Sequence, residues 1–239
     1  MDISGAIFID KPPFVTSYDV IRELKQLLPV KKIGHTGTLD PIATGLMILL
    51  IGSATKLAGY FLKLNKVYNF TVKFGEETDT LDSSGVVINR CDYSHIQIEK
   101  LKSAVSFMQG TIEQYPPIYS AVKYRGKPLY VYARRGETVE LKPRNVKILK
   151  LSIDDFNPPY ATFTTEVSSG TYIRAMAKSI GELIGCFAHV TSLRRLSIGG
   201  FKVEQAFKIE DIKQRLEGME GNYNFLIDKT MLLNKIKGV

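Results

Sequence analysis

The sequence contains few of the residues that build metal centres and disulfide frameworks. It has two cysteines and three histidines among 239 residues, and their spacing matches no metal site or redox motif. It also has no glycine-rich loop with the spacing of a phosphate-binding motif. Cys91 and Cys186 are therefore expected to be reduced, structural residues, as is usual in the cytoplasm. These absences give no indication of a metal ion or a cofactor.

Long hydrophobic runs are also missing. The first apolar run, residues 5–9, is too short for a secretory signal and is followed by Asp10. The longest uncharged stretch, residues 41–55, has 15 residues, fewer than the roughly 20 that a membrane-spanning helix needs. We therefore expect a cytoplasmic protein that does not have a membrane as a partner.

Positive charge is concentrated in one part of the chain. The net charge is +8, while the hydrophobic fraction of 44% and the charged fraction of 23% are those of an ordinary globular protein. Residues 123–150 have nine basic side chains and two acidic ones, so this segment carries +7 of the net charge. Five tyrosines lie within or beside it: Tyr115, Tyr119, Tyr124, Tyr130 and Tyr132.

This mixture of basic and aromatic side chains suits RNA. Cations neutralise phosphates, and aromatic rings accept unstacked bases. The alternative is a solvated basic face that binds nothing. We expect six basic residues to contact the RNA backbone: Lys123, Arg125, Lys127, Arg134, Arg135 and Arg144.

Hydrophobic periodicity predicts both strands and helices. Residues 66–74 alternate, which places Tyr68 and three apolar residues on one face of a strand. Residues 17–28 have helical spacing, with Ser17 as the expected N-cap. The other expected elements are strands at residues 5–10, 46–51, 146–156 and 160–168, and helices at residues 54–64, 96–108 and 171–184. Because the strands cluster rather than alternate strictly with helices, the pattern predicts an α+β fold with a mixed or antiparallel central sheet flanked by helices and loops.

One segment combines the residue types of a reactive loop. Residues 31–45 contain three glycines, a proline, a histidine and a single carboxylate, that of Asp40. The glycines permit close approach of another backbone or of a ligand, and Pro41 biases Asp40 towards an extended conformation. A carboxylate on such a loop is a candidate reactive group. An Asp-Pro pair between two elements is also common as a plain turn, and the pattern alone does not decide between the two interpretations.

The same segment carries a family signature. Residues 34–45, Gly-His-Thr-Gly-Thr-Leu-Asp-Pro-Ile-Ala-Thr-Gly, closely resemble that of the TruB-type tRNA pseudouridine synthases. Further stretches resemble the other motifs of that family, in family order: Lys11-Pro12 with Thr16-Ser17, residues 66–68, residues 74–75 with 78–85, residues 116–123, residues 170–174, and residues 188–190 through 193–196. The resemblance covers roughly residues 5–200 and implies the pseudouridine synthase fold.

The resemblance implies an RNA isomerase that uses no cofactor. Pseudouridine formation breaks the bond from ribose to uracil N1, turns the base over and rejoins it through C5, so nothing is oxidised or added. The implied substrate is tRNA, modified at the T-arm uridine, position 55. Asp40 is then the essential carboxylate, which acts on the substrate after its base has left the stack. Whether Asp40 attacks the sugar or the ring stays open.

The resemblance also implies partners for Asp40. Arg174 is expected to form an ion pair with it, and this arginine lies in the first turn of a predicted helix, where the helix dipole disfavours a cation. Such a broken local rule is typical of functional sites, although an incidental surface ion pair is the alternative. Tyr68 is expected to stack on the flipped uracil and to take part in proton transfer, with a plain core tyrosine as the alternative.

Three further residues are implied to bind the substrate. His35 is expected to fill the gap left by the extruded base, or else to serve only as a hydrogen-bonding residue of the loop. Tyr172 and Leu193 are expected to complete the base pocket, and Leu193 fits simple core packing nearly as well. Asp79 and Asp82 are expected to be turn residues.

The sequence departs from the family pattern at two places. Phe14 stands where the family has a glycine, so we expect a different local turn. Eleven residues follow Asp228, so we expect a single catalytic domain over residues 1–239, with the basic RNA-binding region of residues 115–150 inserted in it and no complete C-terminal PUA module.

Two other functions remain open at this stage. The chain could be a non-catalytic RNA-binding protein or chaperone, although a carboxylate paired with an arginine has no evident use in a pure binder. It could also be a synthase of the same family that a protein or guide complex directs to another RNA. The sequence shows no extra docking segment, so we expect no obligate protein partner.

Overall fold

The computed structural model describes residues 3–217 and 225–237. The chain divides into two compact units. Unit 1 comprises residues 1–68 and 194–239, and unit 2 comprises residues 69–193. Two strands, β4 (Lys66–Phe74) and β12 (Ala188–Ile198), begin in one unit and end in the other. No helix among the described residues is long and apolar enough to cross a membrane.

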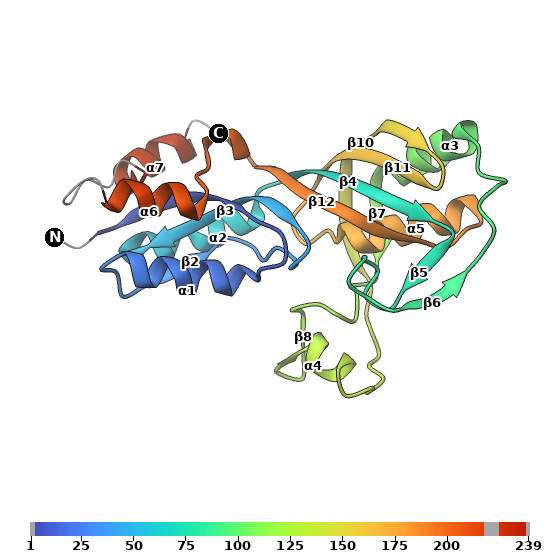
Figure 1. The fold of residues 1–239 in the computed structure, drawn as a ribbon, viewed down its shortest axis with the longest axis horizontal. Helices are drawn as coiled ribbons and strands as arrows, with labels where there is room; N and C mark the ends of the chain where they lie inside the picture. Colours follow the sequence, from blue (N-terminus) through green and yellow to red (C-terminus); the bar gives the residue numbers. More distant parts are fainter. Residues whose placement is uncertain (1–2, 218–224, 238–239) are drawn as a thin grey trace. The chain divides into compact units, whose positions relative to one another are not determined.

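Unit 1 is a mixed sheet covered by helices on both faces (Figure 1). Its other elements are β1 (Gly5–Lys11), α1 (Ser17–Leu27), β2 (Ile33–His35), β3 (Thr44–Ile51), a 3₁₀ helix η1 (Gly52–Leu57), α2 (Ala58–Lys63), β13 (Phe201–Lys202), a 3₁₀ helix η2 (Val203–Gln205), α6 (Ile209–Glu217), β14 (Ile227–Asp228) and α7 (Lys229–Lys237). The strands lie in the order β14-β1-β3-β12, with β2 also paired to β3. The β1–β3 pairing is antiparallel and the β3–β12 pairing is parallel.

The alternation of β1 and β3 explains why both faces of this sheet are covered. Successive side chains of a strand point to opposite faces. Ile7, Ile9, Met47 and Leu49 pack with α1 and α6 in one core cluster. Phe8, Leu46, Ile48 and Leu50 pack on the other face, with Phe61 of α2 and Leu232 of α7. A strand buried on both faces is apolar throughout, and seven of the eight residues of β3 are buried.

Unit 2 is built on a sheet whose last two pairings are antiparallel. Its own elements are β5 (Glu76–Thr78), β6 (Val87–Arg90), α3 (Ile98–Met108), β7 (Gly110–Gln114), β8 (Lys123–Tyr124), β9 (Lys127–Pro128), α4 (Leu129–Ala133), β10 (Arg144–Asn157), β11 (Tyr160–Val167) and α5 (Ile173–Ile184). The strand order is β4-β11-β10-β7, and α3 packs against α5 and β10. The predicted α+β class with a mixed or antiparallel sheet is confirmed.

The structure corrects two details of the sequence prediction and adds a contact between the two cysteines. The N-cap of α1 is Thr16, whose side chain and that of Asp19 form a reciprocal capping box, so the assignment of Ser17 was wrong. The helix predicted at residues 54–64 is a 3₁₀ turn followed by the short α2. Cys91 and Cys186 are both free, but their sulfurs lie 2.6 Å apart, so the two residues are far apart only in the sequence.

Candidate functional site

In unit 1, Asp40 lies on the loop that connects the antiparallel strands β2 and β3. Its side chain is half-buried. The buried hydroxyl of Ser17 holds the preceding residue, because it accepts a hydrogen bond from the Leu39 amide at 2.9 Å and donates to the Leu39 carbonyl at 3.1 Å. On the other side, the Ala43 amide donates to the Asp40 carbonyl at 3.0 Å. The loop is therefore fixed on both sides of the carboxylate.

A buried ammonium group lies beneath this loop. Lys11 is 0% exposed, and its Nζ donates to the carbonyls of Pro12 and Val15 at 2.8 Å and of Pro41 at 3.2 Å. Burial lowers the pKa of Lys11 to about 8, and the negative charge of Asp40 partly opposes that shift. Lys11 therefore fixes the residue next to Asp40 and attracts the carboxylate.

Arg195 connects the two ends of the same loop. It is 1% exposed, and its guanidinium donates to the Leu46 carbonyl at 2.7 Å and to the Gly37 carbonyl at 3.3 Å. Gly45 has a φ of +102°, and a Cβ added to it would collide with the backbone of Arg195. Glycine is therefore required where the loop enters β3, because only glycine permits this backbone conformation and this close approach.

His35 stands at the start of the loop as a neutral aromatic ring. Burial lowers its pKa, and the nearby charge of Arg195 lowers it further. The Gly37 amide donates to His35 Nδ1 at 3.3 Å, so the ring proton lies on Nε2. A neutral, half-buried imidazole at this position can stack on a base without adding a charge.

Tyr68 lies on β4, where buried and half-buried residues alternate as predicted. It is 9% exposed, whereas Phe70, Val72 and Phe74 on the same face are 0% exposed. Two residues before it, the buried Lys66 donates to the carbonyls of Leu62 at 2.8 Å and Leu64 at 2.6 Å, at the end of α2. Tyr68 thus keeps a small accessible surface at the end of an otherwise closed row.

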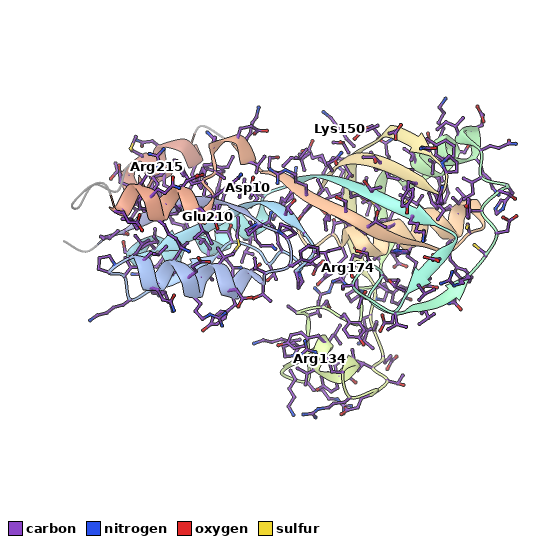
Figure 2. All side chains as sticks on the ribbon, viewed as in Figure 1. Asp10, Arg134, Lys150, Arg174, Glu210 and Arg215 are labelled. Atoms are coloured by element: carbon purple, nitrogen blue, oxygen red, sulfur yellow. The ribbon has the colours of Figure 1, made fainter. Side chains whose placement is uncertain are left out.

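In unit 2, Arg174 lies in the first turn of α5, as the sequence predicted, and it is buried. Its guanidinium donates to the Thr80 carbonyl at 2.6 Å and to the Tyr119 carbonyl at 2.9 Å. One nitrogen lies 3.6 Å from the carboxylate of Asp82. Asp82 is therefore more than a turn residue, because it is an ionic partner of Arg174. Figure 2 labels Arg174 among the side chains.

The neighbouring Tyr172 is held through its backbone. The side-chain amide of Gln114 accepts from the Tyr172 amide at 2.8 Å and donates to the Tyr172 carbonyl at 3.0 Å. The ring of Tyr172 is half-buried. Leu193 is 5% exposed on β12, which fits a pocket wall and core packing equally. Tyr172, the N-cap of α5, and Arg174, in its first turn, are therefore held in neighbouring positions at the start of this helix.

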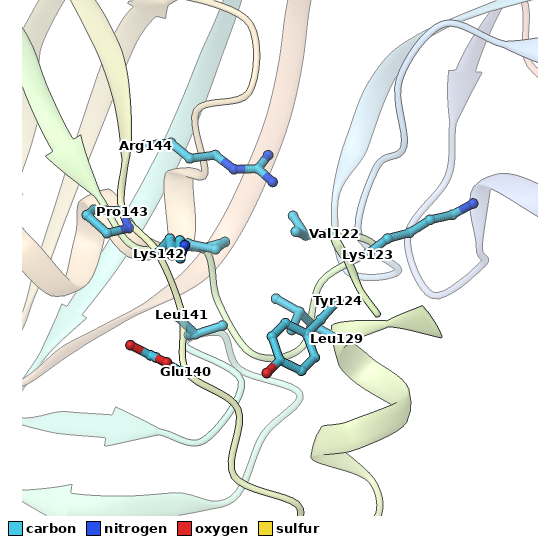
Figure 3. Close-up of a pocket in the computed structure, with 10 residues that line it drawn as sticks. Val122, Lys123, Tyr124, Leu129, Glu140, Leu141, Lys142, Pro143 and Arg144 are labelled. Carbon is cyan, nitrogen blue, oxygen red and sulfur yellow. The ribbon is translucent and has the colours of Figure 1, made fainter. Parts of the chain in front are cut away.

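The basic region leaves the sheet of unit 2 between β7 and β10 and carries β8, β9 and α4 (Figure 1). All nine basic side chains of residues 123–150 are exposed. Arg125 lies over the Tyr124 ring at 5.3 Å and Arg134 over the Tyr130 ring at 5.5 Å. A cavity of about 260 Å³ at its base is lined by Lys123, Tyr124, Lys142 and Arg144, among others (Figure 3).

The comparisons with known proteins agree on one family. The model described as "TruB family pseudouridylate synthase (N terminal domain)" matches residues 25–173, and "tRNA pseudouridylate synthase B C-terminal domain" matches residues 174–232. The tRNA pseudouridine synthase B of Geobacter sulfurreducens is 42% identical over 90% of this chain and 71% of its own length. That of Bordetella avium is 41% identical over 88% and 87%. The chain belongs to the TruB family of pseudouridine synthases.

Solved structures confirm the pseudouridine synthase fold. The chain superposes with a TM-score of 0.70 on a structure from a Cbf5-Nop10-Gar1 complex, at 27% identity, over 90% of this chain and 57% of that one. It therefore spans little more than half the length of that solved chain. A structure of an H/ACA RNP bound to a substrate RNA has the same TM-score at 23% identity, which supports the fold alone. As a TruB-family member, the chain is an RNA isomerase and a tRNA pseudouridine synthase.

Sequence reasoning about this TruB-family chain missed several residues that shape the site. Ser17, Lys11 and Arg195 fix the Asp40 loop, and Gln114 and Asp82 fix the start of α5. Each acts through a contact with a residue distant in the sequence, which periodicity does not reveal. The expected pair of Asp40 and Arg174 involves one residue from each unit, and it stays a prediction.

Proposed function

We propose that this chain converts the T-arm uridine of tRNA, at position 55, to pseudouridine, with Asp40 as the reacting carboxylate. The observation that carries the proposal is the construction of the Asp40 loop. The Asp40 residue is half-buried, while the backbone on both sides of it is held by the buried side chains of Ser17, Lys11 and Arg195. A reactive group held in place by a rigid scaffold needs little reorganisation when the substrate arrives.

The remaining site residues have assigned roles in this proposal. The target uridine leaves its stack, which costs a few kcal/mol, and an aromatic stack returns about 1–3 kcal/mol. Tyr68 and Tyr172 contact the flipped uracil, Leu193 forms an apolar wall, and His35 fills the vacated space. Arg174 is the proposed ionic partner of the Asp40 carboxylate. The proton that leaves C5 after the new bond forms is released to solvent.

The phosphates of the tRNA lie along the exposed basic region in this proposal. Arg125 and Arg134 each lie over a tyrosine ring, so the region offers both charge and aromatic faces. Such surfaces suit the folded, partly single-stranded loops of an RNA. The affinity from these contacts is expected to fall as the salt concentration rises.

The decisive experiment replaces Asp40 by asparagine. With a tRNA transcript that carries tritium at uracil C5, wild-type protein should release tritium and Asp40→Asn should release none, although it still binds the RNA. Asp155→Asn is the matched control, because Asp155 is an exposed carboxylate on β10 and should leave the rate unchanged. Tritium release by Asp40→Asn would refute the role of this carboxylate.

The same assay tests the alternative of a guided enzyme. One of the solved relatives comes from a complex with Nop10 and Gar1, which makes a dependence on partner proteins worth testing. The purified chain should release tritium from a free tRNA transcript without added protein. A transcript in which cytidine replaces the T-arm uridine should release none, because the modified position is missing. Activity that appears only with added cell extract would favour the guided alternative.

A further inference from the structure

Phe14 combines two features that seldom occur in one residue. Its side chain is 83% exposed, and its φ is +64°. A large side chain in this left-handed region is unfavourable, because its Cβ crowds the backbone, whereas glycine adopts the region freely. A ring that is mostly exposed recovers little of this strain by burial. Packing therefore does not explain why a phenylalanine occupies this position.

The backbone of Phe14 is attached to the Asp40 loop. Its amide donates to the Pro41 carbonyl at 2.7 Å, and the same carbonyl accepts from Lys11 Nζ at 3.2 Å. Pro12 and Pro13 precede it and restrict the chain. Strained residues that the surrounding structure holds in this way tend to lie at functional sites. The ring is thus presented to solvent next to the residue that follows Asp40.

We propose that Phe14 is a stacking platform for a nucleobase of the RNA that neighbours the target uridine, a role that rests on the proposed function of the Asp40 loop. Extrusion of a uridine exposes the faces of the bases beside it. An aromatic side chain that is already exposed on a held backbone needs little rearrangement before it stacks on such a face. Stacking tolerates any base, because every base has an aromatic face.

The test compares Phe14→Ala, Phe14→Gly and Phe14→Tyr in steady-state kinetics with a tRNA transcript. A stack formed equally in the ground and transition states changes KM and leaves kcat unaltered. Phe14→Ala and Phe14→Gly should raise KM by about 5- to 100-fold, and Phe14→Tyr should restore it. Phe107→Ala is the control, because Phe107 is 75% exposed on α3 and should not alter KM. Phe14→Gly should also melt at a higher temperature than Phe14→Ala, because only glycine relieves the strain.

Several outcomes would overturn the stacking role. An unchanged KM for Phe14→Ala, a failure of tyrosine to restore KM, or a loss confined to kcat would each contradict it. Gel-shift titration of the same transcript measures Kd without turnover. If the wild-type protein binds this RNA but does not isomerise it, the proposed function fails, and the Kd values of the Phe14 variants still decide the stacking role.

Discussion

The buried pair of Arg174 and Asp82 gives a prediction that the structure quantifies. The two side chains are 4% and 5% exposed, and the closest nitrogen and oxygen lie 3.6 Å apart. At an effective dielectric constant of about 20, two unit charges at such a distance attract by about 4–5 kcal/mol. Removal of one partner from a buried pair generally costs about 3–5 kcal/mol. Asp82→Asn should therefore lower the free energy of unfolding by about 2–4 kcal/mol, since the amide keeps the shape and one acceptor oxygen.

Asp79→Asn is the matched control in the same turn. Asp79 is half-exposed, and its carboxylate accepts from the Val86 amide at 2.8 Å, a bond that the asparagine oxygen can keep. Its replacement should cost less than about 1 kcal/mol. Urea denaturation of the three proteins measures the free energy of unfolding. Equal losses for the two variants would show that the charge of Asp82 does not stabilise Arg174.

The same pair should also affect catalysis. In Asp82→Asn, Arg174 keeps the carbonyls of Thr80 and Tyr119 but has one negative neighbour fewer, so its guanidinium is held less firmly. A small misplacement of a catalytic group can lower the rate by about 100-fold. We expect kcat to fall by roughly 10- to 100-fold with little change in KM. A wild-type kcat in this variant would show that Asp82 does not position Arg174 for the reaction.

Two further predictions concern buried and exposed cations. Burial lowers the pKa of Lys66 to about 8, whereas the pKa of a lysine in the unfolded chain is about 10.4. Between these two pH values the unfolded state binds more protons than the folded state. The free energy of unfolding should therefore rise with pH in this range, by up to about 1.4 kcal/mol per pH unit. Urea denaturation at several pH values should show this rise in the wild type relative to Lys66→Met, and parallel pH profiles would contradict it. Replacement of Arg125, Lys127 and Arg134 by glutamate should weaken tRNA binding. The slope of log affinity against log salt concentration should become less steep by about 0.7–0.9 for each phosphate that the protein no longer neutralises. Reversal of the exposed Lys100 and Lys102 on α3 should leave that slope unchanged, and an equal effect of both sets would show that the basic region does not face RNA.

Local patterns in the sequence predicted much of the fold. The predicted bounds of β4, residues 66–74, are confirmed, and buried and half-buried residues alternate along it. The prediction succeeded because successive side chains of a strand point to opposite faces of the sheet. The predicted end of the helix over residues 171–184 is confirmed, since α5 ends at Ile184 and is capped by Gly185 with a φ of +78°. The helix begins at Ile173 and not at Thr171. Strand β12 was not predicted as a strand. Its neighbours in the sheet, β3 and β4, lie far away in the sequence, and only the short β13 follows it directly, so local periodicity gave little indication of this strand.

The candidate site was predictable to a smaller extent. The family resemblance pointed to the Asp40 loop and to the start of α5, and the one side-chain contact that it implied, between Asp40 and Arg174, stays a prediction. The expected change of turn at Phe14 stays a prediction, although Phe14 adopts the left-handed conformation that glycine favours. The sequence predicts Asp82 as a turn residue because its neighbours in the chain fit a turn. Its contact with Arg174 spans a long stretch of chain, and only the fold brings these two residues together.

The buried cations of unit 1 have a different function from the exposed ones of the basic region. Lys11, Lys66 and Arg195 are 0%, 7% and 1% exposed, so their charged groups cannot reach a phosphate without local unfolding. All three donate to backbone carbonyls, at the Asp40 loop or at the end of α2. Burying a cation is unfavourable unless its donors are satisfied, and a loop rich in glycine has many carbonyls without a partner in a helix or sheet. Lys11 and Arg195 therefore supply hydrogen bonds to carbonyls of the loop, and the positive charge of Lys11 attracts the carboxylate of Asp40.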